Sequence, residues 1–283
     1  MTDPPLREVI ARHGLRAKRS LGQHFLLDGN LTRRIVRAAG DQSGRHVVEI
    51  GPGPGGLTRA LLGSDAASVT VIEIDQRAVE AMHELAAQVS GRLTVIRGDA
   101  LALDPAALVP MPRQIIANLP YNIATPLLIR WLRQAQAFER LTLMFQQEVA
   151  ERICAETGTD AYGRLSVLAQ WTCQVAMLLS IPPSAFVPAP KVYSAVVGLT
   201  PHPIQPDPAL FAAMERLTAA AFGQRRKMLR RALKPIGGET LLRLASIAPD
   251  RRAETLNVAE FDRLARLVLA SETGDKSPKA DLA

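Results

Sequence analysis

A glycine-rich segment is the first part of the sequence that can carry chemistry. It reads V-V-E-I-G-P-G-P-G-G, and Gly51, Gly53 and Gly56 satisfy the G-x-G-x-x-G spacing of dinucleotide-binding turns. Pro52 and Pro54, however, remove backbone N–H donors that a pyrophosphate needs. The turn therefore suits a ligand without phosphate that carries a cationic centre, such as S-adenosylmethionine. The alternative is an ordinary strand-to-helix turn.

Acidic side chains follow this turn at the ends of the next two predicted strands. Glu73 comes 22 residues after Gly51, where a carboxylate can accept the hydroxyls of a ribose. We interpret Asp75 as the N-cap of the helix that begins at Gln76. Asp99 ends the third strand and can accept from the adenine amine of a cofactor, although Asp is also a common turn residue.

The segment from Asn118 to Tyr121 reads N-L-P-Y and follows the fourth predicted strand, at the edge where open α/β sheets bind ligands. This motif suits the transfer of a methyl group to the N6 amine of adenine. That amine is a poor nucleophile because its lone pair is delocalised into the ring. The side-chain oxygen of Asn118 and the backbone carbonyl of Leu119 can accept its two N–H groups, an effect that grows as positive charge develops on nitrogen. Tyr121 offers a ring for stacking of the base. No general base is required, because the proton can leave after the transfer.

Phe186, in the segment S-A-F-V-P, is a candidate for covering the other face of the base. A place in the core is equally consistent with its type. Only Cys154 and Cys173 are present and the histidines are scattered, so we expect reduced thiols and no metal.

Short β-branched runs alternate with helical patterns in the first two thirds of the chain, which predicts right-handed βαβ units and a parallel sheet. The predicted strands are 46–50, 69–74, 93–96, 114–117 and 141–145, and the predicted helices are 56–62, 76–89 and 125–134. Two later strands, 174–179 and 192–199, are predicted to flank a proline-rich segment, and we take them as antiparallel.

Prolines between Thr200 and Pro208 interrupt any regular element and indicate a domain boundary. Beyond it, helices are predicted at 209–222, 225–233, 240–245 and 258–270. The predicted organisation is a basic segment 1–25, an α/β domain 26–203, a helical domain 204–270 and a disordered tail 271–283.

The formal net charge of +7 is unevenly distributed. Residues 26–206 contain 15 basic and 15 acidic residues, whereas 207–270 contain twelve basic and seven acidic ones. Basic ends on a neutral body favour contact with nucleic acid, a merely soluble basic surface being the alternative. The chain has neither a secretory signal nor an apolar run long enough to span a membrane, so we expect a cytoplasmic protein.

With these residues in hand, the chain resembles the bacterial small-subunit ribosomal RNA adenine N6,N6-dimethyltransferases, the family whose loss gives kasugamycin resistance. The likeness runs from about Arg16 to Ala270 and includes L-G-Q-H-F-L, V-E-I-G-P-G, V-I-E, N-L-P-Y-N, A-Y-G-R-L-S, F-V-P-A-P-K-V and A-F-G-Q-R-R-K. It implies a Rossmann-like class I S-adenosylmethionine-dependent methyltransferase domain with a small all-α C-terminal domain. It also implies dimethylation of two adjacent adenosines near the 3′ end of 16S rRNA in a partly assembled small subunit, with a role in assembly.

The resemblance also assigns residues. It implies that the cofactor is bound by His24, Leu26, Gly51, Glu73, Asp99 and Asn118. His24 departs from the family, which often has Asn there, and it can contact the cofactor through its side chain or through its backbone. The same resemblance, with an amphipathic basic pattern, implies that RNA is bound by Arg225, Arg226, Lys227, Arg230 and Arg231. A solvated helix face is the alternative reading of this pattern.

Three other functions are open at this point. The nearest is a large-subunit rRNA adenine methyltransferase of the antibiotic-resistance type, which uses the same chemistry. The second is a non-catalytic assembly factor on the same fold, and the third, ranked last, is a nicotinamide oxidoreductase. We expect a monomer, because nothing in the sequence requires a dimer.

Overall fold

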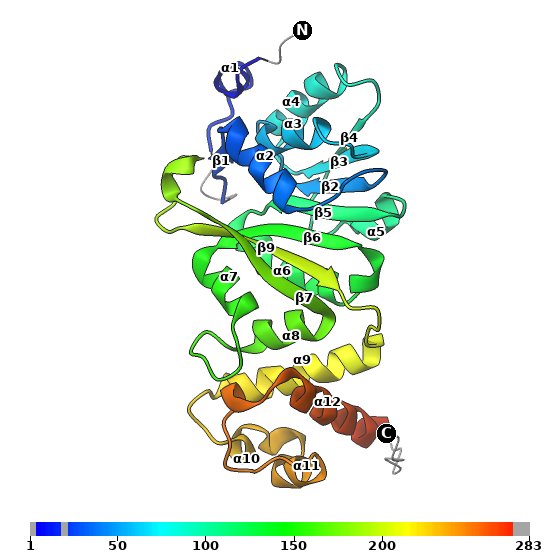
Figure 1. Cartoon of the computed structure of the whole chain (residues 1–283), viewed down its shortest axis with the longest axis vertical. Helices are drawn as coiled ribbons and strands as arrows, with labels where there is room; N and C mark the ends of the chain where they lie inside the picture. Colours follow the sequence, from blue (N-terminus) through cyan, green and yellow to red (C-terminus); the bar gives the residue numbers. More distant parts are fainter. Residues whose placement is uncertain (1–3, 18–21, 274–283) are drawn as a thin grey trace. The chain divides into compact units, whose positions relative to one another are not determined.

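The computed structural model describes residues 4–17 and 22–273 (Figure 1). Its contacts divide the chain into two compact units. One consists of Met1–Ala150 with Val175–Pro201, and the other of Glu151–Gln174 with His202–Ala283. We call the first the sheet unit and the second the helical unit. The segment 151–174 thus groups with the C-terminal helices, a division that differs from the boundary expected near residue 203.

The sheet has seven strands in the order β4-β3-β2-β5-β6-β9-β7. Their bounds are β2 His46–Ile50, β3 Ser68–Glu73, β4 Leu93–Arg97, β5 Arg113–Asn118, β6 Arg140–Gln146, β7 Cys173–Ile181 and β9 Ser194–Pro201. The first five strands of this order pair in parallel, and β9 pairs with β6 antiparallel. The predicted strands are confirmed to within two residues at each end.

Helices cover both faces of this sheet (Figure 1). The strand order reverses between β2 and β5, and right-handed crossovers therefore place α3 and α4 on one face and α6 on the other. The helices outside the helical unit are α1 Leu6–Arg12, α2 Gly29–Ala38, α3 Gly56–Leu62, α4 Gln76–Ala86, α5 Pro105–Leu108, α6 Tyr121–Leu132 and α7 Gln147–Cys154, the last crossing between the units. Asp75 caps α4 by accepting from the Arg77 N–H, as predicted.

A second, two-stranded sheet lies outside the large one. β1 (Phe25–Leu26) pairs antiparallel with β8 (Phe186–Val187), residues that are far apart in the chain. Phe186 and Leu26 belong to the buried core that also contains Val47, Val69 and Ile116. This pairing fixes β1 against the body of the sheet unit.

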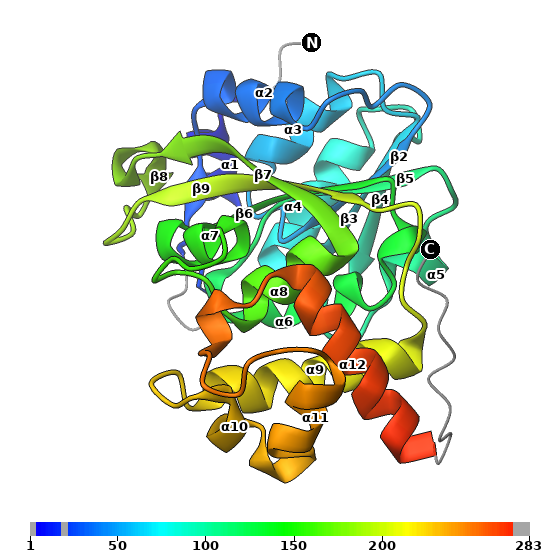
Figure 2. The ribbon, with the colours of Figure 1, turned by 60° about the horizontal axis from the view of Figure 1, so that its bottom comes forward.

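The helical unit contains α8 Arg164–Thr172, α9 Pro208–Gly223, α10 Leu229–Ala232, α11 Gly238–Leu244 and α12 Val258–Thr273, and α9 and α12 run side by side (Figure 2). Among the described residues, two single 3-10 turns lie in this unit, η4 Lys234–Ile236 and η5 Ala253–Thr255, and two lie in the sheet unit, η2 Ala135–Ala137 and η3 Pro183–Ala185. Trp171 of α8 packs on Phe211 with ring centroids 5.8 Å apart, and its Nε1–H donates to Asp262 at 3.0 Å. These contacts tie 151–174 to the helices that follow residue 202.

Two sequence predictions are corrected here. The helix predicted over 225–233 is wrong, because α10 begins only at Leu229. A helix through this region needs the N–H groups of Leu229 and Arg230 to bond back to residues 225 and 226, but they donate to the carbonyls of Arg251 and Pro249 instead. The helix expected from residue 125 begins earlier, at Tyr121.

The tail expected to be disordered from residue 271 differs at its start, since α12 continues to Thr273. Residues 274–283 lie outside the described part of the chain. In the described ranges, no helix is long and apolar enough to cross a membrane.

Candidate active site

A cavity of about 250 Å³ opens at the carboxyl ends of β2, β3, β4 and β5. All of its lining residues belong to the sheet unit. They come from five segments that include every candidate residue of the predicted cofactor and adenine sites except Phe186: 22–26, 49–57, 72–74, 98–101 and 118–123. The order of the strands, rather than the order of the chain, brings these segments together.

The glycine turn lets another segment of the protein approach closely. A Cβ on Gly56 would lie 2.3 Å from the carbonyl oxygen of Leu26, and a Cβ on Gly53 would lie 2.9 Å from the ring of Phe25. Gly53 also has φ +53°, which favours glycine. These glycines therefore let β1 lie against the turn, and Leu26 lines the pocket. Its contact with the cofactor stays a prediction.

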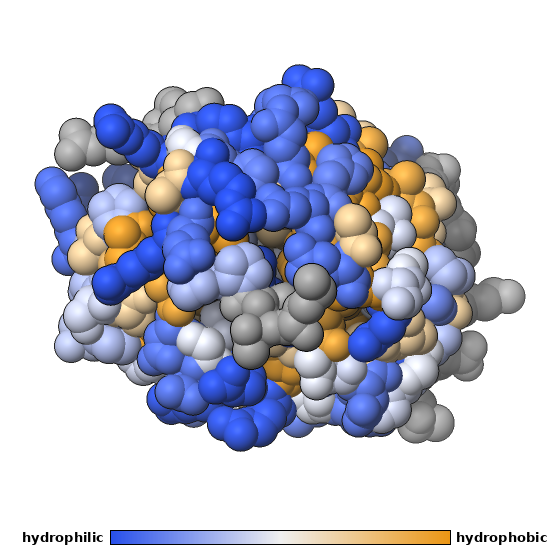
Figure 3. Space-filling view, turned by 90° about the horizontal axis from the view of Figure 1, so that it is seen from above, coloured by the Kyte–Doolittle hydropathy of each residue, from blue (hydrophilic) through white to orange (hydrophobic). Residues whose placement is uncertain are grey.

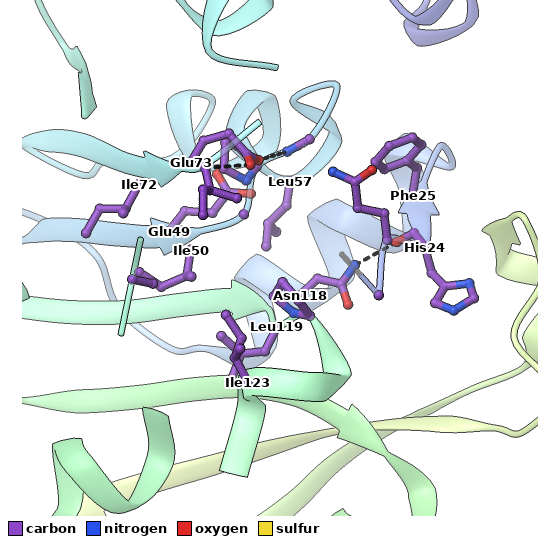
Figure 4. A pocket seen from close by; sticks show the side chains of 18 of the residues that line it. His24, Phe25, Glu49, Ile50, Leu57, Ile72, Glu73, Asn118, Leu119 and Ile123 are labelled. Atoms are coloured by element: carbon purple, nitrogen blue, oxygen red, sulfur yellow. Dashed lines mark hydrogen bonds between the residues drawn. The ribbon is translucent and has the colours of Figure 1, made fainter. Parts of the chain in front are cut away.

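Glu73 lies at the end of β3 with its carboxylate fixed by three backbone donors (Figure 4). Oε1 accepts from the N–H groups of Ile74 and Asp75, both at 2.8 Å, and Oε2 accepts from Gly53 at 3.3 Å. Burial raises the pKa of Glu73, while these backbone hydrogen bonds oppose the rise. A carboxylate has about four acceptor positions, so one remains on Oε2. Its contact with a ribose stays a prediction.

Glu49 is a buried acid that the sequence predictions did not assign to the site. Its side chain is 2% exposed, lines the pocket and accepts from the Thr58 hydroxyl at 2.7 Å. Burial raises its pKa to about 8, and the negative charge of Glu73 adds to the rise, although the Thr58 hydrogen bond lowers it. The E-x-G-x-G pattern contained the signal for this residue.

Two apolar side chains form an exposed wall at the ends of β3 and β4. Ile74 is 51% exposed and Leu101 is 40% exposed, and both line the pocket. Asp99 is exposed between them in the chain and accepts from the Leu101 N–H at 2.9 Å. Large exposed aliphatic residues beside a hydrogen-bond acceptor suit a flat heteroaromatic ring. The signal in the sequence was an aliphatic residue shortly after each strand-end acid: Ile74 follows Glu73, and Leu101 follows Asp99.

The charges of the pocket discriminate between cofactors. Glu49, Glu73 and Asp99 line it, and no Lys or Arg is among the described lining residues. A dinucleotide would place a pyrophosphate beside these acids, whereas S-adenosylmethionine has a net positive charge. The acidic lining of the pocket therefore fits S-adenosylmethionine better than a nicotinamide dinucleotide. In the described part of the chain, no group of three or more His, Cys, Asp or Glu side chains could hold a metal ion.

Asn118 ends β5 and is held by the backbone of the N-terminal segment (Figure 4). Its Nδ2 donates to the carbonyl oxygen of His24 at 3.1 Å. This bond sets the orientation of the amide, and Oδ1 is left as its acceptor. The carbonyl of Leu119 accepts no hydrogen bond from the described residues either. Within residues 4–17 and 22–273, these two neighbouring acceptors therefore have no donor, and their role in the chemistry stays a prediction.

The ring of His24 extends away from the Glu73 end of the pocket (Figure 4). Its Nδ1 lies 2.8 Å from the Pro188 carbonyl, to which it must donate, and its ring stacks on Tyr121 with centroids 5.5 Å apart. The hydroxyl of Tyr121 lies 2.7 Å from Ser194 Oγ. Burial raises the pKa of Tyr121, although the Ser194 hydrogen bond opposes this effect. These contacts favour a backbone contribution from His24 and fix the Tyr121 ring.

Phe186 is separate from the pocket lining. Its side chain is 2% exposed, lies in β8 within the core, and meets the His24 ring edge-on at 6.4 Å. Stacking of Phe186 on a base stays a prediction and needs a rearrangement of this ring.

The predicted RNA-binding residues lie in the helical unit, and their side chains are exposed. The group consists of Arg225, Arg226, Lys227, Arg230 and Arg231. The first three lie in a turn between α9 and α10, and the last two lie on α10. Arg225 donates to the carbonyl of Thr159 at 3.3 Å, which holds the turn against the 151–174 segment.

Comparisons with known proteins show the family of the chain. Residues 14–269 match the family described as ribosomal RNA adenine dimethylase. The ribosomal RNA small subunit methyltransferase A of Gluconobacter oxydans is 65% identical over 95% of this chain and 88% of its own length. That of Rhodospirillum rubrum is 58% identical over 95% of this chain and 93% of its own length.

Two solved structures resemble the whole architecture. A dimethyladenosine transferase from Plasmodium falciparum has a TM-score of 0.73 at 26% identity, covering 89% of this chain and 98% of that one. The 23S rRNA methyltransferase ErmE has a TM-score of 0.67 at 25% identity, covering 86% and 99%. The fold and the pocket together define a class I S-adenosylmethionine-dependent methyltransferase. Within that class, the chain belongs to the ribosomal RNA adenine dimethylase family.

Proposed function

We propose that this rRNA adenine dimethyltransferase methylates N6 of two adjacent adenosines near the 3′ end of 16S rRNA in the small ribosomal subunit. The observation that carries the proposal is the pair of acceptors at the end of β5. The Asn118 amide is oriented by its bond to the His24 carbonyl, and no described residue donates to Oδ1 or to the Leu119 carbonyl.

The residues act on the amine by hydrogen bonding. Oδ1 of Asn118 and the carbonyl of Leu119 accept its two N–H groups and direct the lone pair toward the methyl donor. These bonds strengthen as the nitrogen becomes positive, so they stabilise the transition state more than the ground state. Tyr121, fixed by Ser194, supplies a ring on which the base stacks.

Glu73, Asp99, Gly51 and the Leu26 and His24 backbone would hold S-adenosylmethionine. When bound, S-adenosylmethionine supplies an electrophilic methyl group on a sulfonium centre. The carboxylate of Glu73 would attract the permanent positive charge of the sulfonium, and the aliphatic wall of Ile74 and Leu101 would exclude water from the flat ring.

The names of the relatives support the small subunit as the substrate, since both curated relatives above are small-subunit methyltransferases. A partly assembled subunit and a role in assembly are what the resemblance implies. A cytoplasmic location and a monomeric state are proposed from the sequence, which shows neither a secretory signal nor a feature that requires a dimer. The likeness to ErmE keeps one alternative open, methylation of adenine in 23S rRNA.

Transfer of labelled methyl groups to unmethylated small subunits, large subunits and naked rRNA, followed by mapping of the modified bases, tests the proposal. We expect dimethyladenosine confined to an adjacent pair near the small-subunit 3′ end. Label only in large-subunit RNA would select the ErmE-like activity. Cofactor binding without transfer to any substrate would favour the non-catalytic assembly factor.

The basic residues of the helical unit are proposed to bind rRNA phosphates. The variant Arg226→Glu with Lys227→Glu should weaken small-subunit binding roughly 10-fold or more and reduce its salt dependence, because each neutralised phosphate contributes to counterion release. Cofactor affinity, measured by calorimetry, should not change, since the pocket lies in the sheet unit. Equal loss of both affinities would indicate misfolding and contradict the assignment.

A further inference from the structure

The charge balance of residues 26–206 conceals a basic face on one helix. From Gly29 to Gly40 the sequence has three arginines and no acidic residue. Leu31, Ile35 and Val36 of α2 are buried, whereas Arg33, Arg34 and Arg37 are exposed. The arginines therefore lie on the solvent side of a strongly amphipathic helix.

Most of this face is not neutralised by the protein. The side chains of Arg34, Arg37 and the nearby Arg7 make no hydrogen bond or ion pair within residues 4–17 and 22–273. Arg33 donates to the neutral amide oxygen of Asn30 at 2.8 Å. By contrast, exposed Arg12 pairs with Glu84.

Arg7 and Arg34 also line a groove beside α2. Its other polar lining comes from Asn30, Ser180 and Ser184, and its one described carboxylate, Asp28, is engaged as the N-cap of α2 through the Asn30 N–H at 2.8 Å. Guanidinium, amide and hydroxyl donors are the groups that contact phosphates in nucleic-acid complexes. Figure 3 shows the molecule from above, the side on which Figure 1 places α1 to α4, and both hydrophilic and hydrophobic side chains are exposed on that side.

The groove and the active-site pocket are lined by neighbouring residues at the β1–β8 ribbon. Leu26 of β1 lines the pocket, and the next residue, Leu27, lines the groove. Val187 of β8 pairs with Phe25 and is 50% exposed at the groove. A strand that enters the pocket with one base can therefore pass over this ribbon and reach the arginines.

We propose that the arginine face of α2, with its groove, binds phosphates of the rRNA strand that flanks the target adenosine. The inference rests on the proposed function and adds a second RNA-binding surface, on the sheet unit itself. Phosphate contacts fix the register of a strand without reading its sequence. The face thus positions the substrate, while the pocket selects the base.

The test compares Arg34→Glu, and Arg34→Glu with Arg37→Glu, against Arg97→Glu, an exposed arginine on β4 at the opposite edge of the sheet. Binding of unmethylated small subunits and binding of S-adenosylmethionine are measured separately at several salt concentrations. We expect the double variant to bind subunits roughly 10-fold or more weakly, with a salt slope reduced by about 0.7 for each phosphate of a single strand that is no longer neutralised. Replacement of both residues by Lys should retain most of the affinity.

Unchanged affinity and an unchanged salt slope in the double variant would overturn the inference. It would also be overturned if Arg97→Glu weakened subunit binding as much as Arg34→Glu does, because the effect would then come from net charge alone. If the wild-type protein methylates large-subunit RNA instead, the same variants are compared on that RNA. If only the α2 variants then bound that RNA more weakly, the α2 surface would still be an RNA-binding surface, although the proposed function had failed.

Discussion

The two ends of the pocket are built in different ways. The cofactor end uses Glu49, Glu73, Asp99 and the glycine turn, all within about fifty residues of consecutive strand ends. The adenine end joins the N-terminal segment, the end of β5 and the residues after β8, which are far apart in the chain. The first end is a local property of βαβ units, whereas the second depends on contacts made by the whole sheet unit.

Asn118→Ala should have the largest effect, and this effect should arise mainly at the adenine end. We expect turnover to fall roughly 10²–10³-fold, the scale seen when one preorganised hydrogen-bonding group is removed from a transition state. Single-turnover methyl transfer and the melting temperature are measured together. Asn118→Asp, which keeps an acceptor but loses the bond to His24, should be intermediate. Near wild-type turnover in a folded Asn118→Ala protein would refute the acceptor role.

Glu73→Gln should affect the cofactor end. The amide retains one oxygen for the backbone donors but loses the charge that strengthens a bond to a ribose hydroxyl. Cofactor affinity in calorimetry should fall roughly 10- to 100-fold, while affinity for small subunits alone should stay within about 2-fold. Equal weakening of both would show that the two ends are not separable.

Tyr121 separates stacking from the hydrogen bond to Ser194. Tyr121→Ala should raise KM for the RNA substrate by roughly 10-fold, because base stacking on an aromatic side chain contributes about 1–3 kcal/mol. Tyr121→Phe keeps the ring and should change KM by less than about 3-fold. Similar losses in the two variants would assign the effect to the hydroxyl and its partner on β9.

Glu49 predicts a pH dependence at the cofactor end. Because its pKa is raised from 4.5 to about 8, the folded protein keeps a proton that the unfolded chain has lost between these values. Its contribution to stability is therefore fully present below pH 4.5 and declines as the pH rises to 8. Without cofactor, Glu49→Gln should melt higher than wild type at pH 8, and this gain should vanish near pH 5. Parallel melting curves across this range would rule out a buried, protonated Glu49.

The same contrast explains what could be predicted from the sequence. Strand alternation and the glycine spacing depend on nearby residues, so the five parallel strands and the Asp75 cap were predicted correctly. The β1–β8 ribbon and the Asn118–His24 bond could not be, because no local pattern encodes a pairing between distant segments. Glu49 was passed over because its burial, which decides its pKa, is a tertiary property.

The helical unit shows the same limit. A basic amphipathic pattern predicted one helix over 225–233, but tertiary hydrogen bonds to residues 249 and 251 prevent that helix from extending back beyond Leu229. Likewise, the pattern of 151–174 carries no sign that Trp171 packs on Phe211 of the helix beyond residue 207. The basic residues from Arg225 to Arg231 were predicted to face solvent or RNA, and they are exposed, because exposure of charged side chains follows from their polarity alone.

The His24–Pro188 contact has a consequence for the order of folding. It joins residues 164 positions apart, and such contacts form late because a long loop must first be closed. During synthesis, the glycine turn and the strand ends through residue 101 leave the ribosome well before β8 does. A nascent chain can thus form the glycine turn and the acidic strand ends of the pocket before Asn118 and the β1–β8 ribbon complete it.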